Sequence, residues 1–365
     1  MVEVSPYCAD IARACDGLAG LPPTPALPGS RRENILVTGA TGLIGGCLVD
    51  MLLKMPGWEG VVWAMGRSAQ RGRRRFARYW DSGRFHFLEG DVTQPLPVDV
   101  PFDYIVHAAS GASPKAFQET PVEVMLSNLL GVRQLMEYGL GHGMRRLLYV
   151  SSGEVYGEGN GTPFREADSG YVDPTSPRAC YPSSKRAAET LCVSYAAEYH
   201  ADVVIARPCH VYGPYFAEAD NRAYAQFLRN VLRGEDIVMK SPGLQYRSWL
   251  YVVDCAHALL QILFKGERGT AYNVADEASC ITIRELAETV ARHGGCRVVM
   301  DIDPLNGNTT PVTKATFCTD RLRALGWQPL WSIDEALRHT VGEMKRNEGN
   351  ERNERDERNE RNEGK

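Results

Sequence analysis

A glycine-rich turn near the beginning of the chain limits the possible folds more than any other feature of the sequence. The segment ILVTGATGLIGG places Gly39, Gly42 and Gly45 at three-residue spacing between a short apolar run and a helical pattern. Glycines at this spacing let the backbone approach a pyrophosphate, and the N-terminus of the following helix offers free N–H groups. The turn therefore predicts a dinucleotide-binding site, with a tight turn that holds no ligand as the alternative.

Short apolar runs and helical patterns alternate along the chain after this turn. The runs have the length of strands and lie at 35–37, 61–64, 85–88, 104–109, 147–150 and 203–206. Residues 119–138 carry apolar side chains at helical intervals that form one stripe, namely Val122, Met125, Leu126, Leu129, Val132 and Met136. Continuous apolar strands joined by such helices indicate a parallel sheet covered on both faces. We expect an α/β fold with a Rossmann-type doubly wound parallel sheet.

The end of the second predicted strand bears on which dinucleotide binds. An acid that holds the adenosine ribose is usual at this place, but residues 65–68 read Met-Gly-Arg-Ser. Arg67 suits the 2′-phosphate of NADP, and a solvated arginine is the alternative, because four more arginines lie within residues 71–75. After the third strand, Asp91 and Val92 face either the adenine or a surface turn. NAD and NADP both stay open as cofactors.

A tyrosine and a lysine four residues apart are the strongest catalytic signal. The fifth strand runs into YVSSGEVYG, and the later segment Tyr181-Pro-Ser-Ser-Lys185 begins a helical pattern. Residues four apart lie on one helix face, and an ammonium beside a phenol lowers the pKa of the phenol toward neutrality. The spacing alone is common by chance. Together with the hydroxyls of Ser151 and Ser152 and the glycine turn, it indicates a phenolate base.

Composition excludes several other classes of protein. Lys and Arg total 41 against 45 Asp and Glu, so the chain lacks the basic charge typical of nucleic-acid binding. No apolar window reaches about 18 residues, which excludes a membrane span, and the N-terminus resembles no secretory signal. The ten cysteines form no C-x-x-C pair or zinc spacing. We expect reduced thiols, no metal and a cytoplasmic location.

The chain divides into four parts on these patterns. They are an N-terminal helix with a Pro-rich linker (1–33), the NAD(P)-binding Rossmann domain (34–207), a mixed, mainly substrate-binding lobe with segments that return to the Rossmann core (208–344), and a charged tail (345–365). The helix of the first part is expected at 7–18. The tail repeats Asn-Glu-Arg and predicts either a solvated helical extension or disorder.

Two helices of the lobe carry start signals. Thr282 with Glu285, and Ser332 with Glu335, have the spacing of capping boxes. Gly294-Gly295 is expected to end the first of these helices. The lobe is placed against the carboxyl ends of the sheet strands, where ligands of open α/β sheets bind.

Five segments in this order resemble a known family. TGATGLIG, HAAS, SSGEVYG, YPSSK and RSWLYVVD are similar to the extended short-chain dehydrogenase/reductases of the NAD-dependent epimerase/dehydratase family, which modify nucleotide sugars. The resemblance covers about residues 33–344. HAASGASP, SPRACYPSSKRAAETLC and GPYFAEADNRAYAQF look most like UDP-glucuronate decarboxylases. The resemblance implies a recycled NAD(P)+, NAD+ by family habit, a nucleotide-sugar substrate and a homodimer that forms through a four-helix contact.

The resemblance also implies roles for individual residues. Tyr181 would take the proton of the sugar 4-hydroxyl, Lys185 would lower its pKa and hold the nicotinamide ribose, and Ser152 would bond the same hydroxyl. The implied cofactor residues are Gly39, Thr41, Gly42, Leu43, Ile44, Gly45, Arg67, Asp91, Val92, Ala108, Ala109, Ser110, Asn128, Tyr181, Lys185 and Pro208. The implied substrate residues are Ser113, Ser152, Gly153, Glu154, His210, Arg222 and Arg247, with the last two arginines on the diphosphate.

The residues after Ser152 bear on the reaction. Once C4 is a ketone, a 5-carboxylate can leave as carbon dioxide, a 6-hydroxyl as water, or the hydride can return on the other face. The 4,6-dehydratases place an Asp–Glu pair after the hydroxyl residue, whereas this chain has Gly153-Glu154. A lone Glu is the arrangement of the decarboxylases, and a structural Glu is the alternative.

Three departures from the family pattern keep other interpretations open. His210 replaces an Asn and either transfers a proton or only bonds the ligand. Gly153 replaces a Ser of typical decarboxylases, and Met65 with Arg67 replaces the acid-bearing cofactor pattern. A 4-epimerase, a 4,6-dehydratase, an NADPH-dependent reductase and a non-catalytic cofactor-binding regulator are the alternatives. The intact Ser152, Tyr181 and Lys185 argue against the last.

Overall fold

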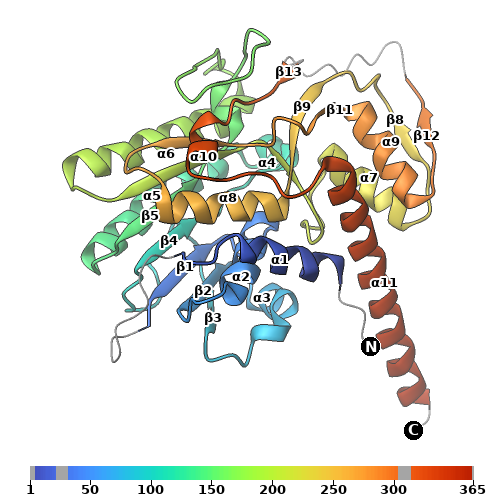
Figure 1. The fold of residues 1–365 in the computed structure, drawn as a ribbon, viewed down its shortest axis with the longest axis horizontal. Helices are drawn as coiled ribbons and strands as arrows, with labels where there is room; N and C mark the ends of the chain where they lie inside the picture. The colour runs from blue at the N-terminus through green and yellow to red at the C-terminus, as the bar shows by residue number, and fades with distance from the viewer. Residues whose placement is uncertain (1–4, 22–31, 303–313, 364–365) are drawn as a thin grey trace.

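A parallel sheet of seven strands forms the base of the fold (Figure 1). In the computed structural model, residues 5–21, 32–302 and 314–363 are described, with side chains through residue 349. The strand order is β10-β6-β5-β4-β1-β2-β3, and all neighbours are parallel. The strands are β1 (Asn34–Thr38), β2 (Val61–Gly66), β3 (Phe85–Glu89), β4 (Tyr104–His107), β5 (Arg146–Val150), β6 (Val203–Pro208) and β10 (Ala271–Val274). The predicted doubly wound α/β fold is confirmed.

Helices cover both faces of this sheet, as the apolar strands require. Along β1, Ile35 and Val37 belong to the apolar core on one face, and Leu36 belongs to the core on the other. The first core is closed by α2 (Leu43–Lys54) and α8 (Val252–Lys265), and the second by α5 (Pro121–Gly141) and α6 (Cys180–Glu198). Alternate side chains of a strand point to opposite faces, so a strand buried on both faces is apolar throughout.

The apolar stripe predicted on α5 is not buried along its whole length. Val132 and Met136 are fully buried against the sheet. Val122, Met125 and Leu126 are 64%, 38% and 41% exposed. The periodicity therefore identified an apolar face correctly but not what covers it. These three side chains form an apolar patch on the described surface.

The residues after β6 build a smaller lobe beside the sheet. Its strands are β7 (His210–Tyr212), β8 (Ile237–Met239), β9 (Tyr246–Tyr251), β11 (Cys280–Thr282), β12 (Val298–Met300) and β13 (Lys314–Ala315). Strand β9 pairs with β7, β11 and β13, while β8 pairs with β12. Its helices include α7 (Ala223–Leu232), α9 (Ile283–Gly294) and α10 (Asp320–Ala324). Helix α8 and strand β10 return to the large sheet.

Both predicted capping boxes are present. Thr282 and Glu285 exchange hydrogen bonds at the start of α9, which ends at Gly295 in the left-handed region, with φ of 78°. Glu335 accepts hydrogen bonds from the backbone N–H and hydroxyl of Ser332, at 3.1 and 2.8 Å, before α11 (Ile333–Glu363). These local signals depend only on neighbouring residues, so the sequence was sufficient to predict them.

The two ends of the chain are helical where they are described. Helix α1 (Pro6–Asp16) packs against α2, α8 and α11, close to the expected 7–18. Helix α11 continues through Glu363 and projects from the body of the molecule (Figure 1), so the helical alternative for the charged tail is the one found. The predicted Pro-rich linker after residue 21 lies outside the described residues.

A buried carboxylate joins α1 to the sheet domain. Asp50 of α2 is fully buried and accepts hydrogen bonds from the Tyr7 hydroxyl at 2.8 Å, Arg75 at 2.5 Å and Arg78 at 2.6 Å. Arg75 ends α3 (Ala69–Arg75), and Arg78 lies in the 3-10 helix η1 (Ala77–Tyr79). Burial would raise the pKa of Asp50, but the two guanidinium groups lower it below its ordinary value. Two basic residues of this arginine-rich segment are therefore used structurally.

The structure can be searched for membrane-spanning helices and for bonded cysteines. Among the described residues, no helix is long and apolar enough to cross a membrane. All ten cysteines lie in the described part of the chain and are free.

We predict that Asp50→Asn lowers the free energy of unfolding by about 3 kcal/mol, because it leaves the largely buried Arg75 without its anion, while the more exposed Arg78 stays in contact with water. Tyr7→Phe, which removes one hydrogen bond, should cost about 1 kcal/mol. Urea unfolding at neutral pH measures both. Because the pKa of Asp50 is lowered, its contribution is complete above about pH 4 and is lost as pH falls through the lowered pKa. Equal stability of wild type and Asp50→Asn at pH 7 would contradict this role.

Candidate active site

The turn between β1 and α2 is shaped by its glycines. Gly39 has φ of 66°, and a side chain at this position would meet the carbonyl oxygen of Ala108, after β4, at 2.6 Å. A side chain at Gly45 would meet the carbonyl oxygen of Gly39 at 2.4 Å. Both positions therefore require glycine. The close approach brings the loop after β4, with Ala108, Ala109 and Ser110, against the turn.

The same turn fits the diphosphate of a dinucleotide. Gly42 is the N-cap of α2 and has no side chain to bond the first N–H groups, and the first turn holds no acid. Thr41, Leu43 and Ile44 surround this helix end, so their backbone can reach a ligand. Free N–H groups and the positive end of the helix dipole bind anions, and we conclude that the residues present suit NAD(P).

Arg67 lies at the carboxyl end of the strand next to β1. It is exposed and directly follows β2, while Ser68 caps α3 by accepting from the N–H of Arg71 at 3.3 Å. Asp91 lies nearby, because Arg67 contributes to the lowering of its pKa, after the larger effect of hydrogen bonds from Thr93. Val92 is buried. Arg67 and Asp91 thus share one edge of the sheet.

A buried asparagine connects the loop after β4 to helix α6. The Ser110 hydroxyl donates to Asn128 Oδ1 at 2.9 Å, and Asn128 Nδ2 donates to the Ser184 hydroxyl at 2.9 Å. Asn128 is fully buried in α5, and Ser184 lies between Tyr181 and Lys185 in the sequence. Asn128 therefore acts on the cofactor side by fixing the position of two segments. Pro208, the remaining predicted cofactor residue, is buried at the end of β6.

Tyr181 is buried beside Ser152. Its ring is 6% exposed and stacks on Phe117 of α4 (Pro114–Glu119), with centroids 4.7 Å apart. Burial raises the pKa of Tyr181 to about 12, and the nearby Glu154 charge raises it too. A hydrogen bond with Ser152 and the charges of Arg222 and Arg178 act in the opposite direction. The phenol is thus protonated in the protein alone.

Lys185 lies one turn further along α6 and is 2% exposed. Its Nζ donates to the carbonyl of Val150 at 2.8 Å and lies 5.7 Å from the centroid of the Tyr181 ring. Burial lowers the pKa of Lys185 to about 7, although Glu189 opposes this shift. From the sequence we predicted that Lys185 lowers the pKa of Tyr181. In the protein without a ligand, burial has the largest effect on the pKa of each group. The predicted pair is present, but its charge depends on what binds beside it.

Glu154 is held by an arginine that the motifs did not identify. Both carboxylate oxygens accept from Arg178 Nη2, at 3.1 and 2.9 Å. Glu154 lies in the 3-10 helix η2 (Gly153–Tyr156) after β5, and Arg178 lies in η3 (Pro177–Ala179) before α6. Arg178 stands three residues before Tyr181, and that proximity to a predicted helix start is the signal that sequence reasoning could have used.

A phenylalanine from the C-terminal part of the chain occupies the space beside Gly153. A side chain built at Gly153 would come within 2.4 Å of the Phe317 ring. Phe317 follows β13 and packs with Tyr156 and Phe164 in a small buried aromatic cluster. The ring therefore explains why glycine stands next to Ser152. No motif in the sequence around either residue predicts this contact.

Three predicted substrate residues share the lobe side of the site. The charges of Arg247, in β9, and Arg222, before α7, both act on His210 of β7. Burial, followed by these charges, lowers the pKa of His210 to about 3, and its Nδ1 has no hydrogen-bond partner among the described residues. A neutral His210 suits hydrogen bonding to a ligand rather than proton transfer at neutral pH. Arg222 is held by Asp220, and Arg247 interacts electrostatically with Glu154.

Ser113, the last predicted substrate residue, begins a helix. Its hydroxyl accepts from the N–H of Ala116 at 3.3 Å and so caps α4. Helix α4 carries Phe117, which stacks on Tyr181. Ser113 thus borders the site through the helix that supports the tyrosine.

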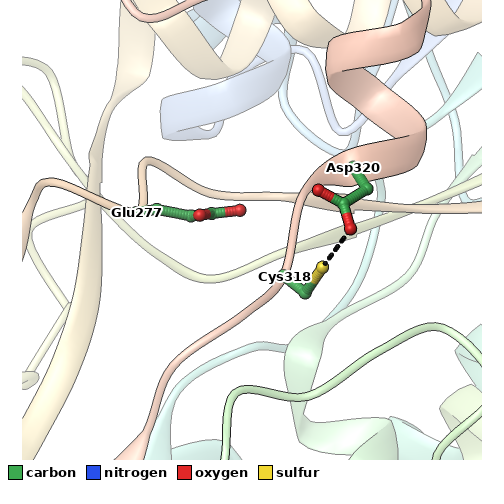
Figure 2. Close-up of side chains that lie close together, drawn as sticks. All are labelled: Glu277, Cys318 and Asp320. Carbon is green, nitrogen blue, oxygen red and sulfur yellow. Dashed lines mark hydrogen bonds between the residues drawn. The ribbon is translucent and has the colours of Figure 1, made fainter.

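A group of metal-ligand atoms lies outside this site. Glu277, Cys318 and Asp320 have ligand atoms within 4.8 Å of one another at the beginning of α10 (Figure 2). The Cys318 thiol bonds Asp320 at 3.1 Å, while Glu277 Oε1 accepts from the N–H and hydroxyl of Thr319, both at 2.8 Å. Glu277 and Asp320 are exposed. Glu277 thus attaches the loop after β10 to the beginning of α10, and we assign no metal to this group.

The sequence of this chain is similar to that of known proteins. A model of the NAD dependent epimerase/dehydratase family matches residues 35–275. UDP-glucuronic acid decarboxylase 6 of Arabidopsis thaliana is 33% identical over 308 residues, which cover 83% of this chain and 86% of the relative.

Two solved structures bound to NAD have the same fold. A UDP-glucose 4-epimerase of Thermus thermophilus is 28% identical, with a TM-score of 0.70, over 86% of this chain and 99% of that one. A dTDP-glucose 4,6-dehydratase of Streptomyces venezuelae is 25% identical, with a TM-score of 0.74, over 87% of this chain and 98% of that one.

We predict that Arg67→Ala weakens binding of NADP+ by about tenfold and changes binding of NAD+ by less than about twofold, because only NADP carries a 2′-phosphate. Isothermal titration of cofactor-stripped protein measures both affinities. Arg71→Ala, one turn into α3, is the matched control and should leave the ratio of the two affinities unchanged. Equal weakening of both cofactors by Arg67→Ala would show that Arg67 does not contact the 2′-position.

Proposed function

Because this chain belongs to the NAD dependent epimerase/dehydratase family, we propose that it is a nucleotide-sugar decarboxylase that acts on UDP-glucuronate. The observation that carries this proposal is the single carboxylate beside the tyrosine. Glu154 follows Ser152 with no second acid, since Gly153 lies against Phe317. The sequence similarity to UDP-glucuronic acid decarboxylases, at 33% identity, supports the choice of sugar.

The first step assigns roles to the buried pair. Tyr181 accepts the proton of the sugar 4-hydroxyl, while Ser152 bonds the same oxygen and fixes its position. When bound, NAD would supply the acceptor for the hydride that leaves C4 of the sugar. Lys185, with a pKa of about 7, supplies a positive charge that favours the phenolate when it is protonated.

The second step breaks a carbon–carbon bond of the oxidised sugar. With a ketone at C4, the carboxylate on C5 belongs to a β-keto acid. The C5–C6 bond breaks, carbon dioxide leaves, and the electron pair remains on C5 and the C4 oxygen as an enolate. Ser152 and Tyr181 donate hydrogen bonds to this oxygen. A proton from solvent is added to C5 and restores the ketone. The hydride taken from C4 in the first step would then return to C4 from the bound cofactor, and Tyr181 gives its proton back to the C4 oxygen.

Dehydration is less well served by these residues. Loss of the 6-hydroxyl as water requires an acid that protonates it, and the dehydratase arrangement has that acid directly after the hydroxyl residue. At this position the chain has Gly153, and a side chain there would meet the Phe317 ring. Decarboxylation needs no such acid, so the site favours it.

Incubation of the purified protein with UDP-glucuronate and NAD+ tests this function. We expect a product lighter by one carbon dioxide, detected by mass spectrometry, with no net consumption of cofactor. Tyr181→Phe should lower turnover by at least about a hundredfold while it keeps the cofactor bound, because the base is lost and the ring is kept. Substantial turnover by this variant would remove Tyr181 as the base.

Other outcomes distinguish the alternatives. Loss of water from a dTDP- or GDP-sugar in the same assay would indicate a dehydratase, and an isomer of unchanged mass would indicate an epimerase. Stoichiometric consumption of NADPH would indicate a reductase. Cofactor binding without turnover of a UDP-, dTDP-, GDP- or CDP-sugar would indicate a non-catalytic regulator.

We also propose that the enzyme forms a homodimer through α5 and α6. These helices pack on each other and carry Val122, Met125 and Leu126 on α5 and Val193 on α6, all exposed by more than a third. A second copy of the same two helices would cover these side chains and complete the four-helix contact that the family resemblance implies. Location in the cytoplasm stays a prediction.

We predict that Leu126→Glu converts the dimer to a monomer, because it places a charge in an apolar contact. Size-exclusion chromatography with light scattering measures the mass. Tyr171→Glu, at an exposed residue on a different surface, is the control and should leave the mass unchanged. A wild-type protein that is monomeric at micromolar concentration would contradict the proposed dimer.

A further inference from the structure

Arg178 is fixed beside the carboxylate of the candidate site. Its Nη2 donates to both oxygens of Glu154, at 3.1 and 2.9 Å. Its guanidinium carbon lies 4.6 Å from the centroid of the Phe117 ring, which stacks on the Tyr181 ring at 4.7 Å. One arginine therefore contacts the carboxylate directly and the tyrosine through a shared aromatic neighbour.

The charge on Glu154 acts on the rest of the site. It opposes ionisation of Tyr181, and it interacts electrostatically with Arg247. In a glucuronate, the carboxylate on C5 is adjacent to the C4 hydroxyl that Tyr181 would contact. A substrate bound to Tyr181 therefore brings its own negative charge close to Glu154. Two carboxylates at such a distance repel each other unless a cation lies between or beside them.

We propose that Arg178 is a positioning residue that neutralises Glu154 and thereby lets the site accept a nucleotide sugar with a carboxylate. This inference rests on the proposed function and adds to it the origin of selectivity for an acidic over a neutral sugar. Arg178 acts through Glu154, not by contact with the sugar. We expect Arg222 and Arg247, not Arg178, to bind the diphosphate.

The geometry supports this role over simple packing. The Arg178 side chain is 54% exposed, so it contributes little to the core, yet both Glu154 oxygens face its Nη2. Contact with Phe117 removes the freedom that normally weakens an exposed ion pair. The ion pair is thus held in one geometry at the place where the sugar would bind.

Binding selectivity tests the proposal. All proteins carry Tyr181→Phe, so that the NAD-loaded enzyme binds substrate without turning it over, and calorimetry measures the Kd of UDP-glucuronate and of UDP-glucose. We expect Arg178→Gln to weaken UDP-glucuronate by about tenfold relative to UDP-glucose, the effect of one uncompensated nearby charge. When Glu154→Gln is added, the selectivity should return to within about twofold of the starting protein, because no charge remains to neutralise.

Two further variants separate charge from structure. Arg178→Lys keeps a cation and should keep most of the selectivity. Arg186→Gln is the matched control, because Arg186 lies on α6 and donates to the backbone carbonyls of Val155 and Gly170 rather than to Glu154. It should change the affinity for both sugars equally and leave their ratio unaltered.

Two results would overturn the role of Arg178. Equal weakening of both sugars by Arg178→Gln would show that the arginine only supports the fold. A loss of selectivity that persists after Glu154→Gln would show that Arg178 contacts the sugar itself. Failure of the proposed function is a different observation, namely that wild-type enzyme releases no carbon dioxide from UDP-glucuronate.

Discussion

Removal of Tyr181 and Lys185 from water is the constraint on which the site depends. Burial raises the pKa of the phenol to about 12 and lowers that of the amine to about 7, so it favours the neutral form of both. A phenolate therefore forms only when nearby positive charges compensate. Arg222 and Arg178 act in that direction and Glu154 acts against it. The arrangement of charges around Tyr181 therefore decides whether it can act as the proposed base.

The features that could be predicted from the sequence are those that depend on residues close together along the chain. The glycine turn, the Tyr181–Lys185 spacing and the capping boxes each depend on residues within a few positions of one another. The order of apolar strands and helices was enough for the doubly wound sheet, since each strand had to be covered on both faces. The apolar stripe of α5 was identified correctly, but its first residues are exposed, because periodicity shows that a face is apolar, not what covers it.

The residues that sequence reasoning missed act across long loops. Arg178 reaches Glu154 from a different 3-10 helix, and Phe317 meets Gly153 only because β13 pairs with β9 in the lobe. The charge state of Tyr181 could not be predicted from the sequence either, because it depends on how deeply the ring is buried. Asp50 provides a similar case in the fold, where three distant residues converge on one carboxylate of α2.

The contact between Gly153 and Phe317 restricts how this enzyme can change over evolution or in the laboratory. Any larger residue at position 153 has to displace the ring, so a single replacement there is expected to strain the aromatic cluster. Shortening residue 317 first opens a void next to Tyr156 and Phe164, with its own loss of stability. Paired replacements at the two positions avoid both costs, and libraries should vary both codons at once.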